Sequence, residues 1–270
     1  MDFSQGALNA LDYAIDIARN FQSLVRLVWV DTSSIKSESG VKNEVRHDAK
    51  LELQSIIEQK TQENEGLDID YKLRKGKVYQ EISSVVKSCN ADMLVIGTHG
   101  ISGFEEFWIG SNAFKIISYS PCPVISVPTI FNRGGVIKTI ILPIDDTFDT
   151  TKKVPMATDL AIAFKADIQM LAVHYTDLGS IRKKTDINIR ETERFLLSKG
   201  IKPKYKSCTV NTNISTSIVK YANGLDADLI VIMTDQNKAT SNILMGLNSQ
   251  QILNSSIIPI LSVKPGKMEF

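Results

Sequence analysis

The stretch ADMLVIGTHG, residues 91–100, decides the fold of this chain because it occurs twice. It returns without a gap as ADLIVIMTDQ at residues 227–236, an offset of 136 residues. The same offset relates PVISV at residues 123–127 to PILSV at residues 259–263. Self-similarity at a fixed, long spacing is typical of a duplicated structural unit, and we predict a tandem duplication.

A second match lies nearer the start of the chain. Residues 2–30 resemble residues 145–173 at an offset of 143, so the second copy is seven residues shorter between the two matches. The segment PTIFNRGG, residues 128–135, has the composition of a linker between the copies. We therefore predict two domains, residues 1–130 and residues 137–265.

Each copy alternates helical and strand patterns. The apolar run MLVIG, residues 93–97, is typical of a parallel strand that is buried on both faces. In the first copy the periodicity predicts helices and strands in the following order: a helix with Leu8, Leu11, Ile15 and Ala18, a strand at 24–30, a helix with Val45, Ala49, Leu53 and Ile56, a strand at 69–73, a helix at 78–89, the strand at 93–97, a short helix from Ser111 and a strand at 124–127. This alternation predicts an α/β protein with a doubly wound, Rossmann-like parallel sheet in each copy.

The first strand of the first copy is missing. The second copy has IKTIILPI, residues 137–144, directly before Asp145, whereas only Met1 precedes the matching Asp2. This strand is central in a doubly wound sheet, so its loss would leave the neighbouring strands with unpaired backbone groups. We expect a truncated start; the alternative is a sheet that closes around the gap or borrows a strand.

Composition limits the classes of function. The chain has 270 residues, 43% of them hydrophobic and 23% charged, with a net charge of +1, which is typical of a globular protein. The balanced charge argues against nucleic-acid and membrane-surface partners. There is neither a leader pattern nor an 18-residue apolar run, and we predict a cytoplasmic protein. Cys89, Cys122 and Cys208 have no metal-ligand spacing and predict small buried apolar residues in a reducing compartment.

The loop GTHGISGFEEFWIGS, residues 97–111, follows a buried strand and leads into a helix. It therefore lies at the carboxyl edge of the sheet, where ligands of such folds bind. Gly97 and Gly100 lack Cβ atoms and permit close backbone approach, while Gly110 and Ser111 begin a helix whose N–H groups attract anions. The residues alone leave open a phosphate site or a tight structural turn in which Ser111 caps the helix. The P-loop and G-x-G-x-x-G fingerprints are both absent.

The pattern G-x2-G-x9-G-[ST], formed by Gly97, Gly100, Gly110 and Ser111, resembles the nucleotide-binding signature of the universal stress protein family. The segments VIGTHG, SPCPVISV and DFS are similar to that family too, and the resemblance covers essentially the whole chain as two copies. It implies a fold like that of the adenine nucleotide alpha hydrolases. It also implies that the ligand is ATP, with or without Mg²⁺.

The resemblance also implies which residues contact the nucleotide. The ribose and phosphates would meet the residues of the glycine pattern and the backbone of the next residue, namely Gly97, Gly100, Gly110, Ser111 and Asn112. Asp2 would bind the nucleoside end, and the backbone of Val30 would meet adenine. Asp2 would directly follow the missing strand.

The second copy keeps the scaffold and changes this chemistry. It retains Gly246 and Asp145, but three residues of the glycine pattern are replaced, with Met233, Gln236 and Leu247 at the positions of Gly97, Gly100 and Ser111. The larger side chains would crowd the backbone approach, and leucine lacks a hydroxyl. We predict no ATP in the second copy, which would act as a structural partner.

The family resemblance implies that the last strands of two domains pair edge to edge. Here Val124–Val127 and Ile260–Val263 would pair within one chain and form a pseudo-dimer, because an uncovered apolar edge strand favours such pairing. The sequence leaves a further homodimer open.

The sequence is compatible with three functions. The first is a non-catalytic, ATP-binding regulatory protein of the stress response with one nucleotide site. The second is an enzyme with at most weak ATP hydrolysis, although no catalytic residue is assigned, since His99 and the pair Glu105 and Glu106 are interpreted as loop hydrogen bonding and solvated charge. The third is a scaffold or interaction protein that binds no nucleotide.

Overall fold

The computed structural model describes residues 1–33, 39–98, 109–131, 133–174, 178–209, 213–234 and 245–265. The first copy contains α1 (Gln5–Phe21), β1 (Val25–Asp31), α2 (Ser39–Glu63), β2 (Ile69–Lys75), α3 (Val78–Ser88), β3 (Leu94–Gly97), α4 (Ser111–Tyr119) and β4 (Val124–Val127). The second contains β5 (Thr139–Ile144), the 3-10 turn η1 (Thr150–Lys153), α5 (Val154–Phe164), β6 (Asp167–His174), α6 (Gly179–Ser198), β7 (Lys204–Thr209), α7 (Ile214–Gly224), β8 (Leu229–Met233), α8 (Leu247–Ser255) and β9 (Ile260–Val263).

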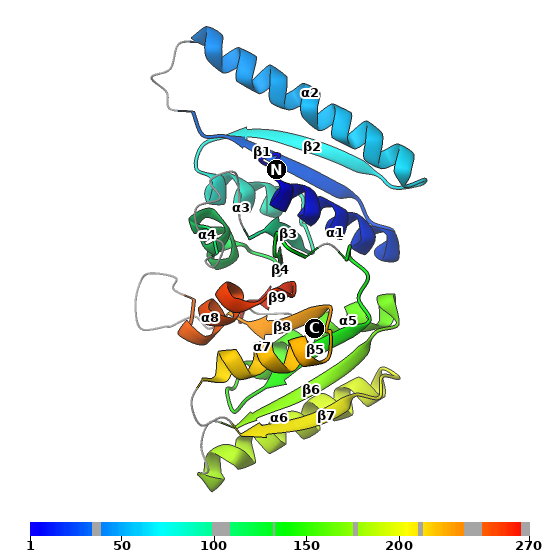
Figure 1. The fold of residues 1–270 in the computed structure, drawn as a ribbon, viewed down its shortest axis with the longest axis vertical. Helices are drawn as coiled ribbons and strands as arrows, with labels where there is room; N and C mark the ends of the chain where they lie inside the picture. The colour runs from blue at the N-terminus through cyan, green and yellow to red at the C-terminus, as the bar shows by residue number, and fades with distance from the viewer. Residues whose placement is uncertain are drawn as a thin grey trace.

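The strands form two sheets. Seven strands are arranged in the order β3-β4-β9-β8-β5-β6-β7, and β1 pairs with β2 in a separate two-stranded sheet (Figure 1). Within the second copy all pairings are parallel. Helices α5 and α6 pack in one hydrophobic core and α7 and α8 in another, so that both faces of this sheet are covered. The predicted α/β fold with parallel sheets is confirmed.

The two copies meet at an antiparallel pair of strands. Strand β4 of the first copy pairs with β9 of the second, with Ile125 opposite Leu261 and Ser126 opposite Ile260. Both strands are buried along their whole length. One sheet therefore runs through both copies, as the predicted pseudo-dimer requires.

The sheet of the first copy is split. In the second copy β5 lies between β8 and β6 and pairs with both, whereas β3 pairs only with β4 and β1 only with β2. Helix α1 lies between the two separated pairs of strands (Figure 1). Within the described part of the chain, the sheet thus neither closes around the gap nor borrows a strand, and a helix takes up the space.

Helix α1 can take this position because it is buried on two faces. One face packs with β1, β2 and α2 through Leu11, Ile15 and Ala18. The other packs with β4 and with strands of the second copy through Ala10, Tyr13 and Ile17. The helical spacing found in the sequence marks the first face alone, since Leu8, Leu11, Ile15 and Ala18 form one stripe. Its counterpart α5 packs against β5 instead, the strand that the first copy lacks.

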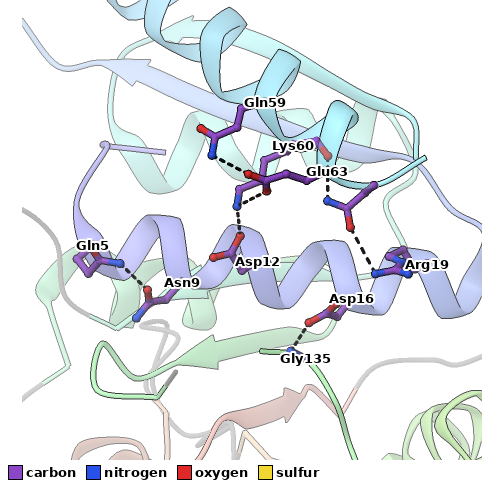
Figure 2. Close-up of polar contacts among 10 residues, drawn as sticks. Gln5, Asn9, Asp12, Asp16, Arg19, Gln59, Lys60, Glu63 and Gly135 are labelled. Carbon is purple, nitrogen blue, oxygen red and sulfur yellow. Dashed lines mark hydrogen bonds and ion pairs between the residues drawn. The ribbon is translucent and has the colours of Figure 1, made fainter. Parts of the chain in front are cut away.

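Polar contacts fix α1 on both sides (Figure 2). Lys60 of α2 donates to Asp12 at 2.8 Å, and the backbone N–H of Gly135 in the linker donates to Asp16 at 2.6 Å. The carboxylate of Asp12 holds the pKa of Lys60 above its usual value, because its hydrogen bond outweighs the effect of partial burial. These contacts tie α1 to α2 and to the linker at the same time.

Two further findings bear on the sequence predictions. Cys89, Cys122 and Cys208 are free thiols and are half-buried, rather than fully buried as expected. Among the helices in the described ranges, none is long and apolar enough to cross a membrane.

Candidate functional site

The end of β3 and the start of α4 are held together by backbone hydrogen bonds. The N–H of Thr98 donates to Val127 of β4 at 3.1 Å, and the N–H of Gly110 donates to the carbonyl of Thr98 at 2.9 Å. The loop is thus closed at its base by a direct contact between its two ends. Residues 99–108, which include Gly100, His99, Glu105 and Glu106, lie outside the described residues.

The first turn of α4 is open to solvent. Gly110 is the N-cap, with φ −57° and ψ 145°, and no side chain caps the helix. Ser111 and Asn112 are exposed. Because Gly110 occupies the cap position, Ser111 does not cap the helix, and its hydroxyl has no hydrogen-bond partner among the described residues. The N–H groups of this turn can therefore receive an anion.

The second copy helps to position this turn. The N–H of Ile109 donates to the side-chain oxygen of Asn254 in α8 at 3.0 Å. The residue before the N-cap is thereby attached to the other domain. No pattern in the sequence indicates this contact, because the two partners are 145 positions apart in the chain.

Gly97 makes a close contact with α1. A Cβ atom at this position would lie 2.6 Å from the carbonyl oxygen of Gly6 and 3.2 Å from the N–H nitrogen of Ala7. No side chain fits there without a shift of backbone. In this structure, Gly97 therefore permits the first turn of α1 to lie close to β3.

Asp2 adopts the same turn as its counterpart in the second copy. Its Oδ1 accepts hydrogen bonds from the hydroxyl of Ser4 at 2.7 Å and from the N–H of Ser4 at 3.2 Å. Asp145 accepts from the hydroxyl and N–H of Thr147 at 2.5 and 2.9 Å. The turn that positions this carboxylate thus forms in the first copy without a preceding strand, because the hydrogen bonds that build it are local.

Val30 lies near the carboxyl end of β1 and is half-buried. The next residue, Asp31, is buried, and its carboxylate accepts a hydrogen bond from the N–H of Ser33 at 2.8 Å and lies 3.5 Å from Lys75. Burial raises the pKa of Asp31, but the contacts with Ser33 and Lys75 outweigh burial and hold the pKa below its usual value. Asp31 fixes the end of the strand that carries Val30, and no motif in the sequence marks this residue.

The first turn of α1 lies between the two groups of predicted residues. Gly97, Gly110, Ser111 and Asn112 gather where β3 ends and α4 begins. On the other side, the nitrogen of Met1 donates to the carbonyl of Val28 in β1 at 2.6 Å, close to Val30. Asp2 follows Met1 and precedes α1. Gly97 thus contacts the first turn of α1, Gly110 is bonded to the residue that follows Gly97, and the residue before Asp2 is bonded to the strand that carries Val30.

The corresponding place in the second copy differs in its side chains. Gly246 is the N-cap of α8, as Gly110 is of α4. Met233 is buried at the end of β8, and its carbonyl accepts a hydrogen bond from the hydroxyl of Ser249 at 2.9 Å. Leu247 is 78% exposed at the position of Ser111, and Gln236 lies outside the described residues. The scaffold is repeated, but an apolar side chain stands where the first copy has a hydroxyl.

Within the part of the chain that the structure describes, no group of three or more His, Cys, Asp or Glu side chains could hold a metal ion.

Comparison with known proteins gives a consistent result. The family described as "Universal stress protein family" matches residues 1–128 and again residues 137–264. Universal stress protein YxiE of Bacillus subtilis is 26% identical over 139 residues, 47% of this chain and 94% of that protein. A universal stress protein of Mycolicibacterium smegmatis is 23% identical over 223 residues, 78% of this chain and 74% of that protein.

Solved structures match the fold. The structure of a universal stress protein from Archaeoglobus fulgidus superimposes with a TM-score of 0.78 at 15% identity, over 98% of this chain and 97% of that chain. Universal stress proteins solved in complex with cAMP and with dAMP match 48% of this chain, each with a TM-score of 0.40.

Proposed function

This chain belongs to the universal stress protein family, and from this membership we propose that its first copy binds one adenine nucleotide, ATP with or without Mg²⁺. The protein then acts as a non-catalytic regulator of the stress response in the cytoplasm. The second copy binds no nucleotide and supports the first through the shared sheet.

The observation that carries this proposal is the open first turn of α4. Gly110 caps the helix without a side chain, and the hydroxyl of Ser111 is exposed and free to donate. Unpaired N–H groups at a helix start favour a phosphate through both hydrogen bonds and the helix dipole. The residues of the G-x2-G-x9-G-[ST] pattern that the structure describes lie at this turn and at the end of β3, where ligands of open α/β sheets bind.

Asp2 precedes α1 and Val30 lies near the carboxyl end of β1, and the nucleoside end would bind at these two residues. Val30 belongs to β1, which pairs with β2 alone among the strands of the described residues. The nucleotide would thus extend from β1 to the start of α4 and would bridge the two halves of the split domain. A ligand that binds only the folded arrangement stabilises it by RT ln(1 + [L]/Kd).

The test is a calorimetric titration of the full chain with ATP, with and without magnesium. We expect one site per chain with a Kd of micromolar order. The variant Ser111→Leu places the residue of the second copy into the first and should weaken binding at least tenfold. The matched control Leu247→Ser makes the reverse exchange and should leave both the stoichiometry and the affinity unchanged.

Two results would contradict the proposal. Two sites per chain would show that the second copy binds as well. No heat and no rise in melting temperature at millimolar ATP would favour a scaffold that binds no nucleotide. Multiple-turnover release of phosphate, measured on the same samples, separates a binding protein from a slow ATPase. Ser111 is a better test position than Gly110, because a Cβ at Gly110 would lie 3.2 Å from the carbonyl of Thr98.

A further inference from the structure

Strand β2 has an unpaired outer edge. It pairs with β1 on one side, and among the strands of the described residues no other strand pairs with it. The N–H of Val25 in β1 donates to the carbonyl of Asp68, the residue before β2, at 2.9 Å. Because the direction of the backbone groups alternates along a strand, the even-numbered residues of β2 face β1. The N–H and C=O groups of Ile69, Tyr71 and Leu73 therefore point outward.

A surface hollow of about 390 Å³ lies along this outer edge. Its walls come from α2 and β2 and consist of Gln54, Ile57, Glu58, Ile69, Asp70 and Tyr71. Ile69 and Tyr71 pack on the face of the small sheet that α2 covers, whereas Asp70 lies on the opposite face, because side chains alternate along a strand. The hollow thus reaches around the edge of β2 and leaves it open to a partner.

The sequence of this edge is complementary to itself in charge. In DIDYKLR, residues 68–74, two acidic side chains precede Tyr71 and two basic side chains follow it at the same distances. When two such strands run antiparallel about a twofold axis at Tyr71, each acidic side chain lies opposite a basic one of the other strand. The opposite pairs are Asp68 and Arg74, Ile69 and Leu73, Asp70 and Lys72, and Tyr71 with itself.

The backbone and the side chains of β2 both permit this register. Tyr71 directs its N–H and C=O outward, so that two such residues can exchange hydrogen bonds across the axis. The partner's Leu73 would lie opposite Ile69, at the hollow beneath α2. On the other face, the charges of Lys72 and Arg74 are available, because neither forms an ion pair within the described part of the chain.

The matching strand of the second copy lacks this pattern. Strand β7 ends the seven-stranded sheet and lies toward the opposite end of the molecule from β2 (Figure 1). Tyr205 stands at the position of Tyr71, but the two aspartates before it are replaced by Lys202 and Lys204. The same pairing of two β7 edges would place Lys204 opposite Lys206, and like charges opposite each other oppose association. Of these two edges, β2 alone is self-complementary.

We propose that this protein forms a homodimer through β2, with the two strands antiparallel about a twofold axis at Tyr71. The contact joins the small sheets of two molecules into one sheet with the strand order β1-β2-β2-β1. It supplies hydrogen-bond partners for the outward backbone groups of β2 and opposite charges for Asp68, Lys72 and Arg74. It also covers the hollow between α2 and the strand edge.

Sedimentation velocity of the full chain over a concentration series measures the association. We expect the mass to rise from the 29.9 kDa of one chain toward twice that value as the concentration reaches the order of 100 μM, as for a small interface. Raising the salt concentration from about 0.05 M to about 0.5 M should weaken the dimer, because ion pairs at an exposed edge are screened.

Exchange of opposite charges tests the register. Asp68→Arg and Arg74→Asp each place like charges opposite each other, and each should weaken the homodimer at least tenfold. An equal mixture of the two variants should associate as tightly as the wild type, because every acidic side chain of the heterodimer again faces a basic one. Asp159→Arg is the matched control, since it makes the same change of charge at an exposed residue of α5 and should leave the dimer unchanged.

Circular dichroism checks the fold of each variant. If Arg74→Asp unfolds, Lys72→Asp takes its place at an exposed residue and should also weaken the dimer at least tenfold. A chain that stays monomeric at a concentration on the order of 0.5 mM would overturn the proposal and leave the edge to an extended segment of another protein. A dimer that Asp68→Arg does not weaken would overturn it too, because the contact would then lie elsewhere.

Discussion

At the candidate site, hydrogen bonds to nearby residues hold individual side chains in position. Asp2 is held by hydrogen bonds to a residue two positions away, and the same is true of Asp145 in the second copy. Such turns are encoded locally and survive the absence of a flanking strand. Asp31 makes the same kind of local contact with Ser33, but it differs in being buried and in its contact with Lys75 of β2. The pH dependence of stability should reveal this difference.

The first prediction concerns Asp31. A carboxylate whose folded pKa is lowered contributes stability above its unfolded pKa, about 3.9, and loses this contribution as the pH falls through the folded value. Asp31→Asn should lower the free energy of unfolding at pH 7 by about 1–2 kcal/mol, since it weakens hydrogen bonds to a charged group. The difference from the wild type should shrink below pH 4. Urea unfolding at several pH values measures it.

The control for this prediction is Asp92→Asn, at an exposed aspartate just before β3. It should change the stability little at either pH. A loss for Asp31→Asn that stays constant from pH 7 to pH 3 would contradict the assigned role of its charge.

At the scale of elements, the position of α1 distinguishes the first copy from the second. Both copies have a helix at this point of the chain, but α5 packs on β5 while α1 packs against β3 and β4. Where β5 would have a counterpart there is a gap, and α1 fills it because its two apolar faces can be buried at once. The absence of a Cβ atom at Gly97 allows the necessary approach of its backbone to that of Gly6.

The second prediction tests this approach. Gly97→Ala would place a Cβ 2.6 Å from the carbonyl oxygen of Gly6, so that α1 or β3 must move. We expect a loss of about 1–3 kcal/mol in the free energy of unfolding, as for other overpacked sites. Denaturant unfolding measures the loss. Gly179→Ala is the control, because a Cβ there meets nothing within 4 Å; equal stabilities of the two variants would show that α1 does not press on β3.

At the scale of the whole molecule, the hydrophobic core does not follow the boundary between the copies. One cluster joins residues of α1 and β4 to β5, β6, β8 and β9. A separate cluster joins α1 to β1, β2 and α2. The β1–β2 pair is attached to the rest through α1 and also through α3, where Val28 and Val30 of β1 pack against another cluster, and a two-stranded sheet has little stability of its own. We expect this unit to open more easily than the seven-stranded sheet.

The third prediction follows from this arrangement and is measured by hydrogen exchange with mass spectrometry. Amides of β1 and β2 should exchange through a local opening, at a lower free energy than those of β5, β6 and β8, which open only on global unfolding. Saturating ATP should slow the exchange of β1 if the proposed site bridges the two halves. Equal protection of all strands without ligand would mean that α1 joins the molecule into one cooperative unit.

The family resemblance implied the two strands that meet at the seam, and the sequence by itself determined the duplication, the α/β class and the order of the elements. It could do so because each is encoded in local periodicity or in direct repetition along the chain. It also showed the glycine pattern, whereas the turn at Asp2 was found in the structure. All of these rest on neighbours in the sequence.

The tertiary structure alone decided where α1 lies, what Gly97 contacts and how the sheet of the first copy divides. It alone brought Asn254 to Ile109 and Lys264 to Ser120, the latter pair 144 positions apart in the chain. The physical reason is that filling a gap in a sheet depends on competition between distant apolar surfaces. Helix α1 is stable in this position only when both surfaces that bury it are present, namely the seven-stranded sheet and the unit of β1, β2 and α2.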